Sequence, residues 1–305
     1  MHGPPHPPPM REKAAAMHIA LDRTTSLVLP AALLAALLGT LALQSGALPQ
    51  FATTGMTGPQ TATIAPRSFS YRATGDFVRD GAPVDGPVLT VDNPAPVEIM
   101  TFPVSETEYA TCVADGACKA AEPRRRGVGN VPVTGVSFRD ATDYANWLSM
   151  QTGATWRLPT VAEWDFAAGS KARDHALGRE TDASDPAERW LAFYEKEAAL
   201  GANALATPQP IGSGGVNEYG VADLGGAVWE WTATCGSRTV MDAAGATVSY
   251  LDSCGVRMLE GRHRTPMSNF IRDAQGGGCN AGVPPDNLGF RLVREPGPFA
   301  FLGWR

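Results

Sequence analysis

Helical periodicity is strongest in three stretches of the chain, and each of them begins with a capping signal. In the strings 105–108, 137–140 and 160–163 a Ser or Thr is followed three residues later by an acidic residue, which is the spacing of a capping box. Apolar residues then recur every three or four positions, as is typical of an amphipathic helix. We therefore predict three helices that begin at these strings, and the second should end at Gly153.

Short apolar runs bounded by Gly and Pro predict strands in the remaining segments. Residues 88–91 and 97–100 have this pattern, and so do residues 155–158 between the second and third helices. From Gly201 onward the pattern changes to short strands joined by long loops. There is no internal repeat, so one mixed α+β domain describes the chain better than two.

The N-terminal part has the pattern of an export signal. Residues 27–43 are almost wholly apolar, Arg23 precedes them, and the small residues 45–47 follow. We therefore interpret residues 1–47 as a signal peptide cleaved after Ala47, which places the mature protein in the periplasm. The alternative is an uncleaved membrane anchor with the domain facing the periplasm, because the apolar run is near the lower length limit for a membrane span.

Composition divides the rest of the chain into three parts. Residues 48–68 are rich in Thr, Gly and Pro and predict a flexible lead-in. Residues 69–296 contain most of the predicted order and should form the folded domain. Residues 297–305 are left as a C-terminal tail.

The overall composition fits a packed, loop-rich protein without a nucleic-acid partner. Hydrophobic residues make up 44% of the 305 residues, and the 33 Gly and 25 Pro favour turns over a helical bundle. The net charge of −6 gives no concentrated basic face, which binding to a phosphate backbone would require. We also expect no membrane contact once the signal peptide has been removed.

The five cysteines fit an oxidising compartment. Cys112 and Cys118 are close enough in sequence to close a small ring, and Cys235 and Cys254 would bridge the Gly- and Ala-rich segment between them. We therefore predict the disulfides Cys112–Cys118 and Cys235–Cys254. Cys279 is left over, either as a buried inert thiol or as a reactive or metal-binding one.

Four longer strings carry a more specific pattern. They run over residues 132–149, 152–164, 217–232 and 287–293. Their order and spacing resemble the formylglycine-generating enzyme family, also called the sulfatase-modifying factor family, over about residues 69–294. The resemblance implies a single domain with a variant of the C-type-lectin-like fold and little regular secondary structure.

Individual residues of these strings also have a physical interpretation. The tryptophans lie on short apolar elements, so most of them are expected to fill the core. Arg157, Glu163 and Arg291 are charges inside otherwise apolar strings. We expect them to pair with other buried groups rather than to contact a substrate.

The resemblance implies a calcium loop in the third string. In that interpretation Asp223 and Glu230 supply side-chain oxygens, while Gly226 and Val228 supply main-chain carbonyls, which are the ligands that Ca²⁺ prefers. The alternative is that Asp223 caps a turn and Glu230 forms an ion pair. We predict a structural calcium ion and keep the alternative open.

The resemblance further implies copper bound by two thiolates, but the sequence does not contain the cysteine pair at that place. Counted back from Asn287, the two positions fall on His263 and Ser268. Because Ser is a poor ligand for a soft metal, the oxidase mechanism of the family should not run unchanged.

Iron is the other redox metal to consider, and an iron site built on two histidines would need His175 together with His263. His263 alone is either a solvated loop histidine or a ligand. As candidates for chemistry with copper or iron we retain His263 and Trp229, which would line a cleft, together with Cys279.

Two kinds of function agree with these residues. The first is an exported protein-maturation factor of this family that acts on a side chain of a periplasmic protein or peptide, in its most specific form as a metal-dependent oxidase. The alternative is a non-catalytic, lectin-like accessory protein that binds a periplasmic client, such as a copper nitrite reductase, during its maturation. The missing cysteine pair favours the accessory role, whereas the resemblance itself favours a maturation factor that acts on its client.

The exported protein should begin at Leu48, because a signal peptidase would cleave after the small residues that end at Ala47. The measurement is the intact mass of the protein recovered from the periplasmic and membrane fractions of expressing cells. A mass that still includes residues 1–47 would instead support the membrane anchor.

Overall fold

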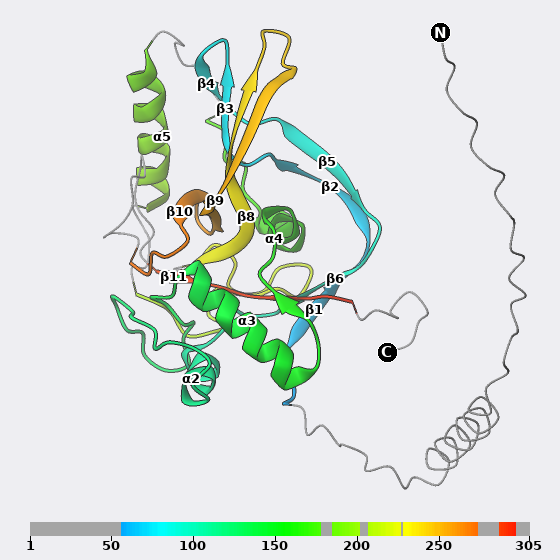
Figure 1. Ribbon diagram of the computed structural model, residues 1–305, viewed down its shortest axis with the longest axis vertical. Coiled ribbons are helices and arrows are strands. Elements are labelled where there is room, and N and C mark those ends of the chain that lie inside the picture. Colours follow the sequence, from blue (N-terminus) through cyan, green and yellow to red (C-terminus); the bar gives the residue numbers. More distant parts are fainter. Residues whose placement is uncertain (1–55, 178–184, 202–206, 227, 274–286, 297–305) are drawn as a thin grey trace, which may run out of the picture. The chain divides into compact units, whose positions relative to one another are not determined.

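The computed structural model describes residues 56–177, 185–201, 207–226, 228–273 and 287–296, all of which belong to one of the chain's two structural units (Figure 1). The predicted signal peptide, the C-terminal tail and Cys279 lie outside these residues. In the part of the chain that is described, no helix is long and apolar enough to cross a membrane.

Order begins earlier in the chain than we predicted. Strand β1 (Thr61–Ile64) and the first residues of β2 (Arg67–Arg72) lie inside the segment expected to be a flexible lead-in. β1 pairs with β6 (Val97–Met100), and Ile64 is buried in an apolar cluster. Partner strands from elsewhere in the chain therefore order a segment whose own composition predicts flexibility.

Three helices begin at the predicted capping boxes. They are α2 (Glu106–Ala114), α3 (Phe138–Thr152) and α4 (Val161–Ala168), and in each the Ser or Thr cap and the acidic residue satisfy each other's backbone amides. α3 ends as predicted at Gly153, whose φ of 68° is a left-handed conformation that Gly adopts readily. A further helix, α5 (Pro186–Gly201), was not predicted.

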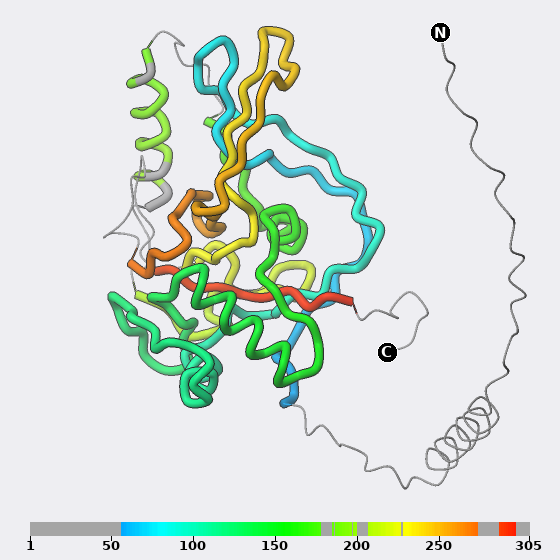
Figure 2. Tube along the Cα trace, viewed as in Figure 1, coloured from blue at the N-terminus to red at the C-terminus, as the bar shows by residue number. Residues whose placement is uncertain are grey.

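The strands of the described residues form three sheets. A four-stranded sheet has the order β1-β6-β12-β7, in which β7 is Trp156–Arg157 and β12 is Val293–Arg294. A larger sheet has the order β10-β9-β8-β3-β4, in which β3 is Asp76–Arg79, β4 is Ala82–Val84, β8 is Trp229–Met241, β9 is Thr247–Glu260 and β10 is Thr265–Ser268. β11 (Leu288–Gly289) joins the larger sheet beside β8, and β2 pairs separately with β5 (Val88–Asn93). The C-terminal segment, red in Figure 2, thus connects the two larger sheets.

A long hairpin of β8 and β9 corrects our expectation of short strands after Gly201. Its two strands contain 13 and 14 residues and rise above α2, α3 and α4 in Figure 1, with α5 beside them. The pairing register shifts near Cys235, which breaks the alternation of apolar and polar residues that would have revealed a long strand.

Both predicted disulfides are present. Cys112–Cys118 closes a ring at the end of α2. Cys235–Cys254 joins the two strands of the hairpin, so it links neighbouring strands rather than spanning a loop as we expected.

The core is built largely from the four strings identified in the sequence. The predicted core tryptophans are all buried, at 4% exposure or less, and they are Trp156, Trp164, Trp229 and Trp231. Phe290 and Leu292 of the last string pack into the same cluster as helix α3. Arg157 pairs within the protein, as predicted, and its partner is Glu163, although both side chains are partly exposed.

Arg291 is fully buried in the core, and its partner is Glu230 on β8. Its Nε donates to Glu230 Oε2 at 2.6 Å and its Nη2 to Glu230 Oε1 at 2.7 Å. The remaining guanidinium hydrogens reach the backbone carbonyls of Thr101 and Ala222. Trp164 of α4 also donates to Glu230, so one ion pair connects three separate parts of the chain.

Replacing Arg291 with Met should lower the free energy of unfolding by about 3–5 kcal/mol, because it leaves Glu230 as an uncompensated buried charge. The measurement is urea-induced unfolding followed by tryptophan fluorescence. Arg294→Met is the matched control: its pair with Glu98 has 46% and 29% exposed side chains and should contribute at most about 1 kcal/mol. Equal losses in the two variants would contradict the central role of Arg291.

Candidate functional site

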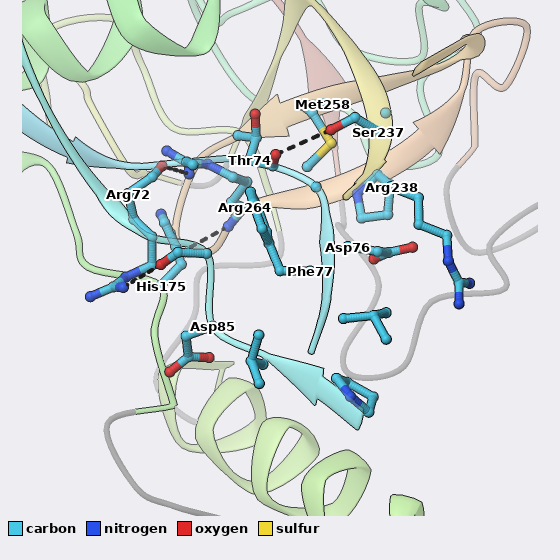
Figure 3. Close-up of a pocket in the computed structure, with 18 of the residues that line it drawn as sticks. Arg72, Thr74, Asp76, Phe77, Asp85, His175, Ser237, Arg238, Met258 and Arg264 are labelled. Atoms are coloured by element: carbon cyan, nitrogen blue, oxygen red, sulfur yellow. Dashed lines mark hydrogen bonds between the residues drawn. The ribbon is translucent and has the colours of Figure 1, made fainter. Parts of the chain in front are cut away.

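A cavity of about 600 Å³ lies between the β3–β4 hairpin, the upper part of β8 and β9, and helix α5 (Figure 3). Much of its wall is apolar, contributed by Phe77, Val84, Phe193, Val256 and Met258. A cavity of this size with an apolar wall and a few polar groups is typical of a ligand site.

Two ion pairs frame the cavity. Arg72 binds Asp174 through two hydrogen bonds, and Arg189 of α5 binds Asp85 at 2.7 Å. The second pair helps to hold α5 against the loop that follows β4. Within each pair the two charges neutralise each other, so neither pair presents an unbalanced charge to a ligand.

Arg264 and His175 form the inner end of the cavity and lie next to each other in Figure 3. The Arg264 guanidinium donates from Nη2 to Asp165 Oδ2 at 2.6 Å, from Nε to Glu260, and from Nη1 to the carbonyl of Arg72 at 2.8 Å. One buried cation therefore serves two buried carboxylates.

His175 is neutral and its ring is fixed by its neighbours. Its Nδ1 accepts a hydrogen bond from the backbone amide of Arg264 at 3.3 Å, which assigns the ring proton to Nε2. Nε2 lies 3.7 Å from Glu260 Oε2. Burial, reinforced by Arg264, lowers the pKa of His175 to about 3. His175 thus presents a neutral ring to the cavity, while its nitrogen atoms face Arg264 and Glu260.

Glu260 and Asp165 have raised pKa values because both are buried. Burial outweighs Arg264 and raises the pKa of Glu260 to about 8 and that of Asp165 to about 6. Glu260 Oε2 and Asp165 Oδ1 are buried without a hydrogen-bond partner among the described residues. With two acids around one arginine, the cluster can hold a proton near neutral pH and release it at higher pH.

This cluster, Asp165, His175, Glu260 and Arg264, was missed in the sequence. The available signal was a charge inside an apolar run, since Glu260 follows Met258 and Leu259. The same signal correctly indicated the pairing of Arg291. It could not identify the whole cluster, because Asp165 lies on another element, α4, and is connected to Glu260 through Arg264.

His263 and Trp229 come together, but they do not line the cavity. Their rings are 5.2 Å apart, and Trp229 Nε1 donates to the carbonyl of His263 at 3.1 Å. Both side chains are buried, at 5% and 1% exposure, so the expectation of a solvated loop histidine is wrong. Burial, with a contribution from Arg262, lowers the pKa of His263 to about 4, so its ring is neutral at physiological pH.

The two positions implied for copper do not form a dithiolate site. His263 is buried against Trp229, and Ser268 is half-buried at the end of β10. A hydroxyl and an imidazole do not reproduce two thiolates, so we derive no copper chemistry from them. Cys279, the third candidate for chemistry, lies outside the described residues.

Among the described residues, one group of three side chains has metal-ligand spacing, and it contains neither histidine. The group is Cys235, Asp252 and Cys254. The structure thus does not assemble the two-histidine iron site considered from the sequence.

The residues of the predicted calcium loop make the contacts described by the alternative interpretation. Asp223 accepts hydrogen bonds from the backbone amides of Gly212 and Gly214 at 2.6 and 2.7 Å. Both oxygens of Glu230 bind Arg291. Calcium binding that also uses the carbonyls of Gly226 and Val228 stays a prediction.

Replacing Glu260 with Gln should flatten the pH dependence of stability between pH 6.5 and pH 8. A pKa raised from 4.5 to about 8 means that the folded protein retains a proton, so stability falls as the pH rises through this range. The slope is at most about 1.4 kcal/mol per pH unit. The lowered pKa values of His175 and His263 make the protein less stable only below pH 6.5. The raised pKa of Asp165, about 6, affects the stability of the protein mainly below this range as well.

The measurement is urea unfolding at several pH values within that range. Glu122→Gln, at a 72% exposed side chain, is the control and should keep the wild-type slope. A wild-type slope in Glu260→Gln would show that Glu260 is already ionised in the folded protein.

Comparison with known proteins agrees with this fold. Residues 46–296 match the family described as the sulfatase-modifying factor enzyme 1-like domain. The formylglycine-generating enzyme of Mycobacterium tuberculosis (strain ATCC 25618 / H37Rv) is 36% identical over 188 residues, which cover 54% of this chain and 58% of that protein. The mouse protein named inactive C-alpha-formylglycine-generating enzyme 2 is 32% identical over 175 residues, covering 55% and 50%.

Among solved structures, that of PvdO from Pseudomonas aeruginosa is similar with a TM-score of 0.50 and 21% identity, covering 78% of this chain and 94% of that one. The likeness to PvdO concerns the fold alone. The chain spans about half the length of the curated relatives that it matches. Since the family match covers most of the chain, the protein belongs to the sulfatase-modifying factor family.

Proposed function

We propose that this protein is an exported maturation factor that binds a segment of a periplasmic protein or peptide in the cavity and acts on one of its side chains. The observation that carries the proposal is the cavity itself, which has an apolar wall and ends at the buried cluster around Arg264. Family membership supports a role in modifying or maturing another protein.

The residues that line the cavity are the ones expected to determine which client binds. Its lining residues fall in the segments 72–86, 175–193, 236–238 and 251–266, all outside the four strings that carry the resemblance. The residues of these segments can therefore differ from those of other family members and match a client specific to this protein. The disulfides support export, because such bonds persist in oxidising compartments.

The second candidate is a non-catalytic accessory protein that binds a client without changing it. Two observations favour it over a copper oxidase of the family type. The copper positions hold His263 and Ser268, and His263 is buried against Trp229 rather than open to the cavity. One relative at 32% identity is named as an inactive formylglycine-generating enzyme. Copper or iron chemistry would require a ligand set other than these two residues.

Leu251 offers a way to test the cavity without disturbing the core. It lines the cavity, yet its side chain is 69% exposed, so Leu251→Arg should obstruct binding with little effect on stability. In a host strain that depends on the protein, this variant should lose function while folding normally. The readout is the intact masses of exported proteins, compared between wild type and variant.

Val248→Arg is the matched control, since Val248 is 67% exposed on the same strand and does not line the cavity. A client mass shift that disappears only in Leu251→Arg supports a catalytic maturation factor. A client that keeps its mass but fails to accumulate supports the accessory role. Equal function in both variants would contradict binding at the cavity.

A further inference from the structure

The Cys235–Cys254 disulfide lies beside a carboxylate in an arrangement that suits a metal ion. The sulfur atoms and an oxygen of Asp252 all lie within 4.8 Å of one another. Cys235 is half-buried, while Asp252 and Cys254 are exposed, so reductants and ions can reach the group. In the observed oxidised state the sulfurs are bonded to each other and cannot act as thiolate ligands.

We propose that reduction of this disulfide turns Cys235, Cys254 and Asp252 into a binding site for a soft divalent cation of the Zn²⁺ class. A dithiol reductant breaks the S–S bond, gives two electrons and two protons, and becomes a disulfide itself. The metal then binds the two thiolates and displaces their protons.

The backbone around the cysteines is held in place independently of the disulfide. Cys235 pairs with Arg257 while Gly236 pairs with Ser253, so residues 254–256 form a bulge in β9. On the other side, β10 supports this bulge: Asn269 N donates to Gly255 O at 2.9 Å, and Ser268 pairs with Val256. The two thiols should therefore remain close together after reduction.

A cation beside Cys235 favours the form that binds metal. Arg257 Nη1 lies 3.2 Å from Cys235 Sγ, and its guanidinium is held 4.3 Å from the Phe138 ring. A fixed positive charge near a sulfur stabilises the thiolate. Arg257 therefore favours the thiolate of the half-buried Cys235, while Asp252 and Cys254 are exposed to an incoming ion.

The donor set selects the class of metal. Two thiolates exclude Ca²⁺ and Mg²⁺, which take oxygen ligands. The carboxylate completes three ligands of a tetrahedral site and leaves the fourth position to water, an arrangement suited to Zn²⁺. Gly236, Ser253 and Val256, which flank the two cysteines, also line the cavity, so a bound ion would alter its wall.

Co²⁺ serves as a visible substitute for Zn²⁺ in the test, in full-length mature protein with Cys279→Ser so that the remaining thiols belong to the two disulfides. After reduction with a phosphine under argon, the protein should bind about one Co²⁺ and show thiolate-to-cobalt charge-transfer absorption. The oxidised protein should show none. Near-UV circular dichroism follows whether the fold persists, and its loss on reduction would overturn the proposal.

Asp252→Asn separates this site from adventitious thiol binding, because it keeps both cysteines and changes an exposed side chain. We expect it to weaken metal binding at least about tenfold, the lower end of what loss of a ligand's supporting group causes. Cys112→Ser/Cys118→Ser, which removes the other disulfide, should keep the absorption. Unchanged affinity in Asp252→Asn, or absorption that persists in Cys235→Ser/Cys254→Ser, would overturn the proposal.

Discussion

Two buried acidic side chains face each other across the β8–β9 pair, and the structure depends on the arginines that pair with them. Glu230 and Glu260 are direct register partners, and neither is exposed beyond 1%. Arg291, from the C-terminal segment, pairs with Glu230, and Arg264, the residue before β10, pairs with Glu260 and also with Asp165. Since an uncompensated buried charge costs several kcal/mol, these pairs fix how the C-terminal segment and β10 meet the hairpin.

Helix α4 connects the two ion pairs through adjacent residues. Trp164 donates to Glu230, and Asp165 accepts from Arg264. The helix has only eight residues, but its capping box fixes where it begins and so aims both side chains. The four strings that carry the resemblance thus supply much of the buried core, while the cavity is built from segments outside these strings.

Local signals in the sequence were sufficient for part of this structure and insufficient for the rest. A capping box involves residues three positions apart, so the starts of α2, α3 and α4 were predictable. Arg291 is a charge within an apolar string, so its pairing with a buried acid was predictable too. The long hairpin was not, because the bulge at residues 254–256 breaks its alternating pattern. The cluster around Arg264 joins residues about 100 positions apart, and no short-range pattern reports such a contact.

The ion pair of Arg291 and Glu230 and the outer wall of the cavity lie in different segments of the chain, and this separation affects how the sequence can diverge. The outer wall, formed by the β3–β4 hairpin, α5 and residues 236–238 and 251–253 of the β8–β9 pair, contributes little to the ion pairs of Arg291 and Arg264, so mutations can accumulate there and change what is bound. At the inner end, Arg264 belongs to both parts, and its replacement would disturb recognition and folding at once. With the proposed function, related proteins should therefore differ in what they bind mainly through the outer wall, while the residues at the inner end vary little.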